Sequence, residues 1–104
     1  MRVIPHPEVE HLHLAGVLHA LSDPVRLEIV WVLADGEEIS CGRIDVSVSK
    51  STLSHHLKVL RDAGLTRTRT AGVQRFVSLR REDLDLRFPG LLELVLSHAP
   101  AELV

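Results

Sequence analysis

Hydrophobic residues recur at intervals of three or four positions in five stretches of this chain and alternate with polar residues in a sixth. The wider spacing is typical of helices that bury one face, whereas strict alternation is typical of half-buried strands. The alternation covers residues 65–79, where Ala71-Gly72 supplies a turn and predicts a two-stranded hairpin. The pattern therefore predicts a mainly α domain with one small β-hairpin. The five predicted helices are residues 8–21, 25–34, 39–46, 50–63 and 90–98.

The fourth predicted helix has clear local signals at both ends. Leu53, Leu57 and Leu60 form one apolar stripe of a helix with 3.6 residues per turn. Ser49 precedes this stripe and can cap the first turn with its hydroxyl, while Gly64 suits the left-handed position after the last turn. The sequence therefore predicts a helix that begins after Ser49 and ends before Gly64.

Shorter sequence signals predict the structure of the rest of the chain. Two prolines within residues 1–7 predict an extended arm, and Ser22-Asp23-Pro24 is a typical helix start. The predicted helix at residues 39–46 is joined to the fourth helix by a turn of three residues. Two helices joined so tightly form a helix-turn-helix, here residues 39–64. The hairpin at residues 65–79 would then be the wing of a winged helix-turn-helix.

The exposed face of the fourth helix carries groups suited to DNA recognition. With Leu53 at the buried centre, Ser51, Thr52 and His55 point away from the core and can contact base edges in the major groove. Cations and hydroxyls beside them and on the hairpin can reach phosphates. An ordinary amphipathic surface helix is the alternative for this stretch alone. The predicted backbone-contacting residues are Ser49, Lys50, Ser54, Lys58, Arg61, Arg67, Arg69 and Arg75.

The charge of the chain is unevenly distributed. The whole sequence has a formal net charge of −2, but residues 42–81 contain nine Lys or Arg and two Asp, a net charge of +7. A basic face on an acidic body is typical of a nucleic-acid-binding domain. One Trp, two Phe and no Tyr are too few for the stacking platform that binds single strands. We therefore expect double-stranded DNA as the partner.

Two motifs resemble those of the ArsR/SmtB family of winged-helix repressors. Residues 19–29 read HALSDPVRLEI, similar to the family's "ALadptRlrIL", and residues 51–65 read STLSHHLKVLRDAGL, similar to "ST(V/L)S(R/H)HLkvLreaGL". The resemblance covers about residues 9–98. It implies a homodimeric bacterial transcription regulator, usually a repressor that an inducer releases from its operator. It also implies that His56 packs inside the domain and that His55 faces outward.

The sequence departs from that family at a metal-binding motif. Residues 38–44 read EISCGRI where metal-responsive members carry a motif like ELCVCDL. Ser40 and Gly42 therefore stand at the two cysteine positions, and Cys41 lies between them. The thiolate pair that would chelate a soft metal is missing, so we predict no metal and no cofactor here. Cys41 alone is a candidate redox switch, with an ordinary small packed residue as the preferred interpretation.

Two other sets of residues are candidate metal ligands. The last predicted helix offers only Glu93 and His98 as ligands. The N-terminal histidines could bind a metal between two subunits, but His11 and His13 diverge on a helix, so a solvated helix face is the preferred interpretation. A metal-responsive repressor with this non-standard site stays an alternative. The four N-terminal histidines are His6, His11, His13 and His19.

Surplus apolar residues on the first and last predicted helices indicate self-association. Residues 8–21 and 90–98 carry more Leu and Val than one small core needs, and a second copy would bury the excess. A homodimer would place two reading helices about one DNA turn apart, on a palindromic operator. The alternative is that both helices only close the core of one chain. The predicted dimer residues are Val9, Leu12, Val17, Leu91, Leu94 and Val95.

We therefore expect residues 1–104 to form one winged helix-turn-helix domain that binds DNA sequence-specifically, with repression as its expected effect. A winged-helix dimer whose basic face binds protein or RNA is the alternative. The sequence contains no nucleophile–base set, phosphate-binding glycine loop or HExxH helix, so an enzyme is not expected. One Cys and no signal peptide or membrane span predict the cytoplasm. A small-molecule inducer that binds near Trp31 is the first candidate for the signal that releases the protein from its operator.

Overall fold

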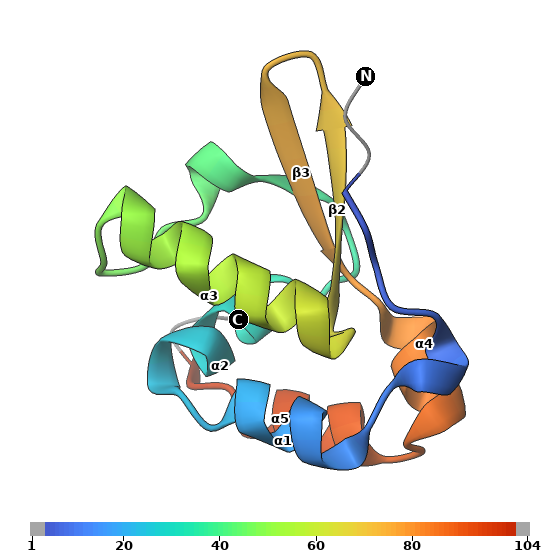
Figure 1. The fold of residues 1–104 in the computed structure, drawn as a ribbon. Helices are drawn as coiled ribbons and strands as arrows, with labels where there is room; N and C mark the ends of the chain where they lie inside the picture. Colours follow the sequence, from blue (N-terminus) through green and yellow to red (C-terminus); the bar gives the residue numbers. More distant parts are fainter. Residues whose placement is uncertain (1–3, 102–104) are drawn as a thin grey trace.

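The computed structural model describes residues 4–101, which form five α-helices and three strands. The β2–β3 hairpin projects from one end of the molecule, α1 and α5 lie at the opposite end, and α3 crosses between them (Figure 1). The α-helices are α1 (Leu14–Leu21), α2 (Pro24–Val32), α3 (Lys50–Ala63), α4 (Arg81–Arg87) and α5 (Leu91–Ser97). The strands are β1 (Ile39–Ser40), β2 (Thr66–Ala71) and β3 (Gln74–Leu79), and two short 3-10 helices are η1 (Val9–His11) and η2 (Cys41–Arg43).

Helix α3 forms where its local signals predicted it. The Ser49 hydroxyl accepts a hydrogen bond of 3.2 Å from the backbone N–H of Thr52, which caps the first turn. Gly64 ends the helix with a φ of +91°, a left-handed conformation that side chains disfavour. A Cβ atom at Gly64 would also collide with Cδ2 of Leu12, so this position needs glycine for two reasons. Both predicted ends of the helix are confirmed.

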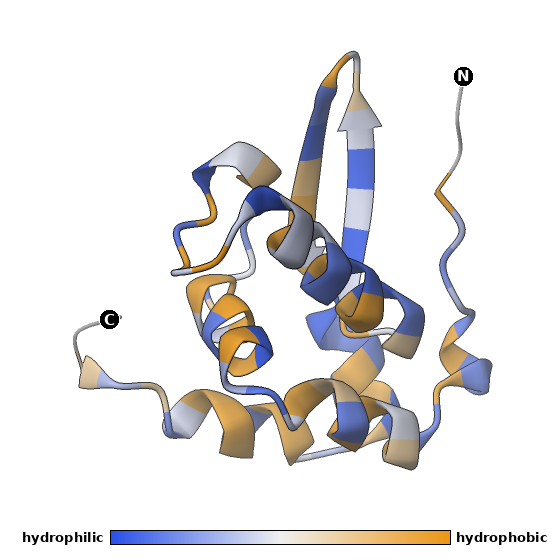
Figure 2. Ribbon diagram, turned by 60° about the vertical axis from the view of Figure 1, so that its left-hand side comes forward, coloured by the Kyte–Doolittle hydropathy of each residue, from blue (hydrophilic) through white to orange (hydrophobic). Residues whose placement is uncertain are grey.

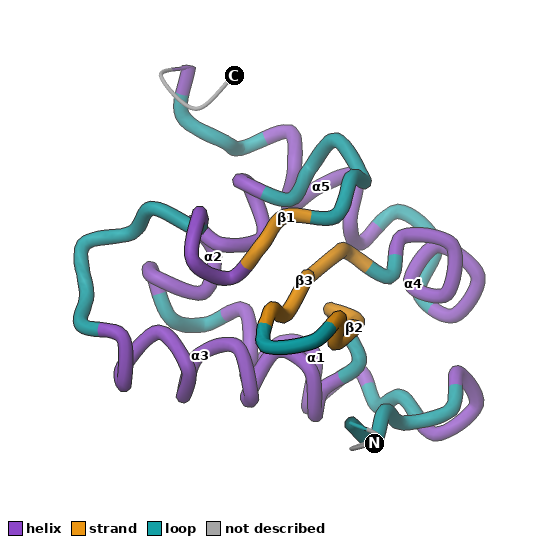
Figure 3. The backbone as a smooth tube through the Cα atoms, turned by 90° about the horizontal axis from the view of Figure 1, so that it is seen from above, coloured by secondary structure: helices purple, strands orange, loops and turns teal. Residues whose placement is uncertain are grey.

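The sheet has one strand more than the predicted hairpin. Strands β2 and β3 pair antiparallel from Thr66–Leu79 to Ala71–Gln74, which confirms the wing. Strand β1 adds to the other edge of β3, opposite Val77 and Phe76, so the sheet order is β1-β3-β2. Figure 3 shows the three strands side by side from above. The two-stranded hairpin therefore extends to a three-stranded sheet.

The predicted helix at residues 39–46 is wrong. Ile39 and Ser40 are the strand β1, Cys41–Arg43 are the single 3-10 turn η2, and Ile44 is extended with its side chain buried. Gly42 disfavours a helix by about 1 kcal/mol relative to alanine. The free edge of β3 offers this segment backbone hydrogen bonds that no local pattern reveals. The first helix of the helix-turn-helix is thus reduced to one turn.

The predicted helix at residues 8–21 is interrupted. The 3-10 helix η1 is followed by Leu12 in an extended conformation, and α1 begins only at Leu14. Leu12 is 2% exposed and packs against Gly64, and its carbonyl accepts a hydrogen bond of 3.1 Å from Nε of Arg87. Burial of Leu12 over the end of α3 therefore accounts for the break, because a continuous helix would carry that side chain elsewhere.

One core lies under α3 and joins all the helices to the sheet. It contains Val17 of α1, Ile29 and Val30 of α2, Leu60 of α3 and Val77 of β3, each fully buried. Figure 2 shows this interior in orange, with hydrophobic residues also lining much of α1 and α5 at the base.

No helix within residues 4–101 is long and apolar enough to cross a membrane.

Candidate nucleic-acid interface

The predicted base-reading residues lie together on the exposed face of α3. Ser51, Thr52 and His55 are all exposed and face away from the core. The Ser49 hydroxyl lies 3.2 Å from that of Ser51 and donates to that of Thr52 over 3.0 Å. The hydroxyls at the start of the helix therefore form one connected group. This end of α3 is both capped and rich in hydrogen-bonding atoms.

A buried polar network fixes the helix from behind. His56 is 8% exposed, and its Nδ1 lies 3.2 Å from a guanidinium nitrogen of Arg26 in α2. Arg26 also donates to the backbone carbonyls of Ala20 and His19, over 2.6 and 3.3 Å. One buried guanidinium thus links α1, α2 and α3. The inward His56 implied by the family resemblance is confirmed, and it orients the outward His55.

Polar and cationic residues flank the reading face toward the wing. Lys50 and Ser54 are exposed, while Arg61 is half-buried. Lys58 is held by Asp62 one turn later, with 2.7 Å between Nζ and the carboxylate oxygen. This pair is exposed, so water and salt weaken it and leave Lys58 able to contact a phosphate.

The wing arginines differ in what holds them. Arg69 makes two hydrogen bonds, of 2.9 and 3.0 Å, to the carboxylate of Glu38 and lies over the ring of Phe76. Arg67 contacts the carboxylate of Asp83 over 3.4 Å. Arg75 is exposed, and no carboxylate within residues 4–101 pairs with it. The hydrogen bonds from Arg69 hold the pKa of Glu38 below its ordinary value.

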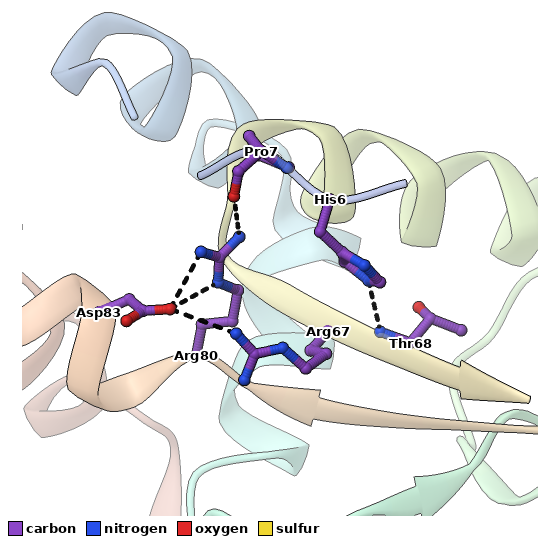
Figure 4. A network of polar contacts seen from close by, with 6 residues as sticks. All are labelled: His6, Pro7, Arg67, Thr68, Arg80 and Asp83. Carbon is purple, nitrogen blue, oxygen red and sulfur yellow. Dashed lines mark hydrogen bonds and ion pairs between the residues drawn. The ribbon is translucent and has the colours of Figure 1, made fainter. Parts of the chain in front are cut away.

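Arg80, which contributed to the basic charge of residues 42–81, is not part of the surface. It is 5% exposed, binds Asp83 over 3.0 Å and donates to the carbonyl of Pro7 over 2.8 Å. Figure 4 shows how this guanidinium fastens the N-terminal segment beside β2. The exposed face therefore carries one cation fewer than the sequence count indicated.

The predicted N-terminal arm, residues 1–7, is described from residue 4 onward and follows the edge of β2. Nε2 of His6 accepts a hydrogen bond of 2.9 Å from the backbone N–H of Thr68, which satisfies a donor on the outer edge of the sheet (Figure 4). Partial burial and the charges of nearby arginines, Arg67 first among them, lower the pKa of His6. The arm is therefore attached to the wing through a neutral histidine.

The comparisons with known proteins agree with this architecture. The profile of a helix-turn-helix domain matches residues 21–69. The chain is 43% identical over 82 residues to an uncharacterised HTH-type transcriptional regulator, YceK, of Bacillus subtilis, covering 76% of this chain and 82% of that protein. It is 40% identical over 78 residues to the arsenical resistance operon repressor of Staphylococcus xylosus, covering 74% and 75%. The solved transcriptional repressor BigR of Xylella fastidiosa superposes with a TM-score of 0.64 at 32% identity, covering 85% and 87%.

The chain belongs to the ArsR family of winged helix-turn-helix transcriptional regulators. It is a DNA-binding regulator, as the members of this family are. Helix α3 is the second helix of its helix-turn-helix and the β2–β3 hairpin is its wing. The two sequence motifs that resemble this family fall on the end of α1 with the start of α2, and on α3.

The metal-site positions of this ArsR-family chain lack a ligand cluster. Within residues 4–101 no group of three or more His, Cys, Asp or Glu side chains is placed to hold a metal ion. Ser40 and Gly42, which replace the family's cysteines, lie at the end of β1 and in η2. The Nε2 atom of His6 is already engaged with β2. The absence of metal control stays a prediction.

Cys41, the first residue of η2, is half-buried. Burial raises the pKa of its thiol above the ordinary value, although Arg75 and Arg61 partly oppose this shift. Oxidation proceeds through the thiolate, so a raised pKa disfavours the proposed redox role. Cys41 instead lines a cleft together with residues of α3 and the wing.

The predicted dimer residues occupy different environments. Leu12 and Val17 are 2% and 0% exposed and belong to the core of one chain, so their assignment to a dimer surface is corrected. Val9, Leu91 and Val95 are partly buried against the same core, and Leu94 is 59% exposed. The prediction counted helical turns along one continuous helix, but the chain is extended at Leu12. Leu12 and Val17, which were expected at the dimer surface, therefore face the core. The large apolar side chains of α1 that are exposed are Leu14 and Leu18.

Several contacts that shape this interface carry no recognisable sequence signal. Arg26 and His56 are 30 residues apart, Glu38 and Arg69 are 31 apart, and His6 and Thr68 are 62 apart. Each pair forms only because the fold brings distant segments together. The two family motifs contain Arg26 and His56, but neither motif indicates that these two residues contact each other.

Proposed function

We propose that this protein represses transcription by binding an operator as a homodimer, with α3 of each subunit in the major groove. The observation that carries this proposal is the outward face of α3, where Ser51, Thr52 and His55 stand exposed on a helix fixed from behind by Arg26. Side chains on a rigid helix can present hydrogen-bonding groups to base edges in a constant register. Ser49 and the cations beside α3 then contact the adjacent phosphates.

The wing supplies contacts that do not depend on sequence. Arg75 is exposed and unpaired within the described part of the chain. Arg67 and Arg69 are also exposed and can exchange the carboxylates of Asp83 and Glu38 for phosphate oxygens. Val73 at the hairpin turn is fully exposed, which lets the tip approach the sugar–phosphate backbone closely. The wing therefore adds affinity and orientation, whereas α3 adds specificity.

The proposed dimer forms at the base, through α1 and α5. Leu14, Leu18 and Leu94 are 49%, 48% and 59% exposed there, and both helices lie at the end opposite the wing (Figures 1 and 2). A two-fold axis through this base would leave both α3 helices free to face DNA. The Nε1–H of Trp31 donates to the carbonyl of Val95 over 2.9 Å and links α5 to α2. This bond offers a route between the dimer surface and the reading helix.

The experiment is selection of bound duplex fragments from genomic DNA, followed by titration of the selected fragment and a random duplex at several salt concentrations. We expect an imperfect palindrome with half-sites about one turn apart, and a log–log salt slope that reflects several phosphate contacts. No preference for any duplex, with tight binding of RNA or of a protein, would instead support the alternative use of the basic face. Loss of operator binding on stoichiometric addition of Zn²⁺ would support the N-terminal histidine site.

A further inference from the structure

A cleft of about 460 Å³ separates α3 from the wing and η2. This volume is within the range of small-molecule sites. Its apolar part comes from Leu53 and Leu57 of α3 and from Cys41 of η2, and Thr68 of β2 also lines it. Because the lining comes from four separate elements, α3, η2, β2 and β3, a ligand there would contact the reading helix and the wing at once.

The charge of this cleft has one sign. Its charged lining residues are Lys50, Lys58, Arg61 and Arg75, with no Asp or Glu among them. A second cleft of about 470 Å³ near α4 differs in this respect, because Glu82, Asp83 and Asp85 line it together with its arginines. Lys58 is paired with Asp62, but no carboxylate within residues 4–101 forms an ion pair with Lys50, Arg61 or Arg75. Apolar surface beside such cations matches a ligand with an apolar body and a negative group.

One donor on a residue that lines the cleft lacks a partner. The Nε–H of Arg61 is buried, and no acceptor within residues 4–101 receives it. Buried donors without an acceptor are uncommon, because desolvation of the group is then uncompensated. A carboxylate accepts such hydrogen bonds from a guanidinium in a planar, two-point geometry. Arg75 of β3 lines the same cleft and can approach the same anion.

The cleft is adjacent to the reading face but distinct from it. Ser51, Thr52 and His55 do not line it. Five residues predicted to contact phosphate do line it, namely Ser54 and the cations Lys50, Lys58, Arg61 and Arg75. A small anion in the cleft would therefore engage the same cations that a DNA phosphate requires. Base contacts would be untouched by the ligand itself, and the competition would be electrostatic.

We propose that this cleft binds a small monocarboxylate with an apolar body, and that its occupation opposes DNA binding. The carboxylate of the ligand accepts hydrogen bonds from Arg61 and Arg75. Its apolar body packs on Leu53, Leu57 and Cys41. The second half of the proposal rests on the proposed function, whereas the first half does not. It places the inducer site beside α3 and the wing rather than near Trp31, which lines neither cleft.

The cleft is tested first without DNA. We would titrate the full chain with 2-naphthoate, its neutral analogue 2-naphthalenemethanol and inorganic phosphate, measuring affinity by calorimetry and location by amide chemical shifts. The naphthoate should bind about tenfold more tightly than the alcohol, with shifts around Cys41, Leu57 and Thr68. Equal binding of the alcohol would overturn the role of the carboxylate. If inorganic phosphate binds as tightly as naphthoate, the small-molecule assignment is overturned. The cleft would then be only a binding site for a phosphate of the DNA backbone.

Variants then distinguish binding in the cleft from non-specific attraction of the anion to positive charge. Arg75→Met, at an exposed strand position, should weaken naphthoate binding about tenfold, and Arg61→Met should do the same if the variant folds. Arg43→Met removes one positive charge from exposed η2 outside the cleft and should leave binding unchanged. An equal loss in Arg43→Met would overturn the assignment, because it would show attraction to net charge alone.

DNA is added last. Saturating naphthoate should raise the apparent Kd for the selected duplex about tenfold, while the alcohol should not. Naphthoate that binds the cleft without changing DNA affinity would overturn the competition. A protein that binds naphthoate but no duplex at any salt concentration would refute the proposed function and would still support the cleft as a carboxylate site.

Discussion

His6 links the protonation of one side chain to the attachment of the N-terminal arm. Its Nε2 accepts the N–H of Thr68, so the ring must be neutral, and its pKa in the folded protein is lowered by burial and by Arg67, Arg61 and Arg80. Between this pKa and the ordinary value of 6.5 the unfolded chain binds more protons than the folded one. The contribution of His6 to stability is therefore complete above pH 6.5 and is lost as the pH falls below it.

We expect the His6→Gln variant to lose this part of the pH dependence, because the amide oxygen can accept the same hydrogen bond without titrating. Denaturant unfolding of wild type and variant across this pH range measures the difference directly. His11→Gln changes an exposed histidine and should keep the wild-type profile. The same profile in all three proteins would contradict the role of His6.

Arg69 binds the carboxylate of Glu38 within the protein and is also proposed to contact a DNA phosphate. Glu38→Gln removes the carboxylate that holds Arg69, so binding to preferred and random duplexes should tighten alike, by about two- to fivefold. Arg69→Ala should weaken both duplexes and reduce the salt slope by about one contact. Glu82→Gln removes the same charge from exposed α4 and controls for net charge. A change in sequence preference for Glu38→Gln would contradict a backbone role for Arg69.

The predictability of single residues follows the range of their interactions. The outward positions of Ser51, Thr52 and His55 could be predicted, because helical phase within one stretch decides them. The partners of Arg67 and Arg69 could not, because Asp83 and Glu38 are 16 and 31 positions away. Prediction of a basic surface from charge alone also counted Arg80, which the fold buries.

At the scale of elements, the end of α3 depends on Gly64. Gly64→Ala should destabilise the protein by about 2–4 kcal/mol, because the left-handed backbone is strained and the new Cβ collides with Leu12. Gly36→Ala is the matched control, since Gly36 has a φ of +83° but open space where a Cβ would lie. That variant should lose about 1 kcal/mol. Equal losses, measured by denaturant unfolding, would show that Leu12 moves aside freely.

Elements were predictable where their signals are local. Helix α3 carries its cap, its apolar stripe and its glycine within one stretch, so both ends could be placed. Residues 39–46 carry apolar spacing that fits a helix, but pairing of Ile39 with Val77 makes this segment a strand. The break before α1 likewise depends on Leu12 reaching Gly64, 52 positions later in the chain.

At the scale of the whole molecule, the proposed dimer depends on the base formed by α1 and α5. Leu14→Glu or Leu94→Glu should give a monomer, because a charge would be buried in an apolar interface. The operator affinity of these variants should fall with the loss of the second half-site. Leu86→Glu alters an equally prominent leucine, 74% exposed on α4, and should stay dimeric. Sedimentation of the wild type as a monomer at micromolar concentration would refute the dimer.

The overall architecture was predictable because the two motifs and the hairpin together specify a winged helix-turn-helix. A self-association surface was predicted from surplus apolar residues, but two of the six side chains assigned to it were placed wrongly. Leu12 and Val17 fill the core, while Leu14 and Leu18 remain exposed. Sequence composition indicates how much apolar surface a chain carries, and only the fold determines which side chains remain uncovered.

The most direct test of the central claim is the ratio of affinities for the selected duplex and a random duplex, in wild type, Thr52→Ala and His55→Ala. The account predicts that each substitution costs about 1–3 kcal/mol on the selected duplex and little on the random one, so that the ratio collapses. Equal losses on both duplexes, or none on either, would contradict the claim that the exposed face of α3 reads bases.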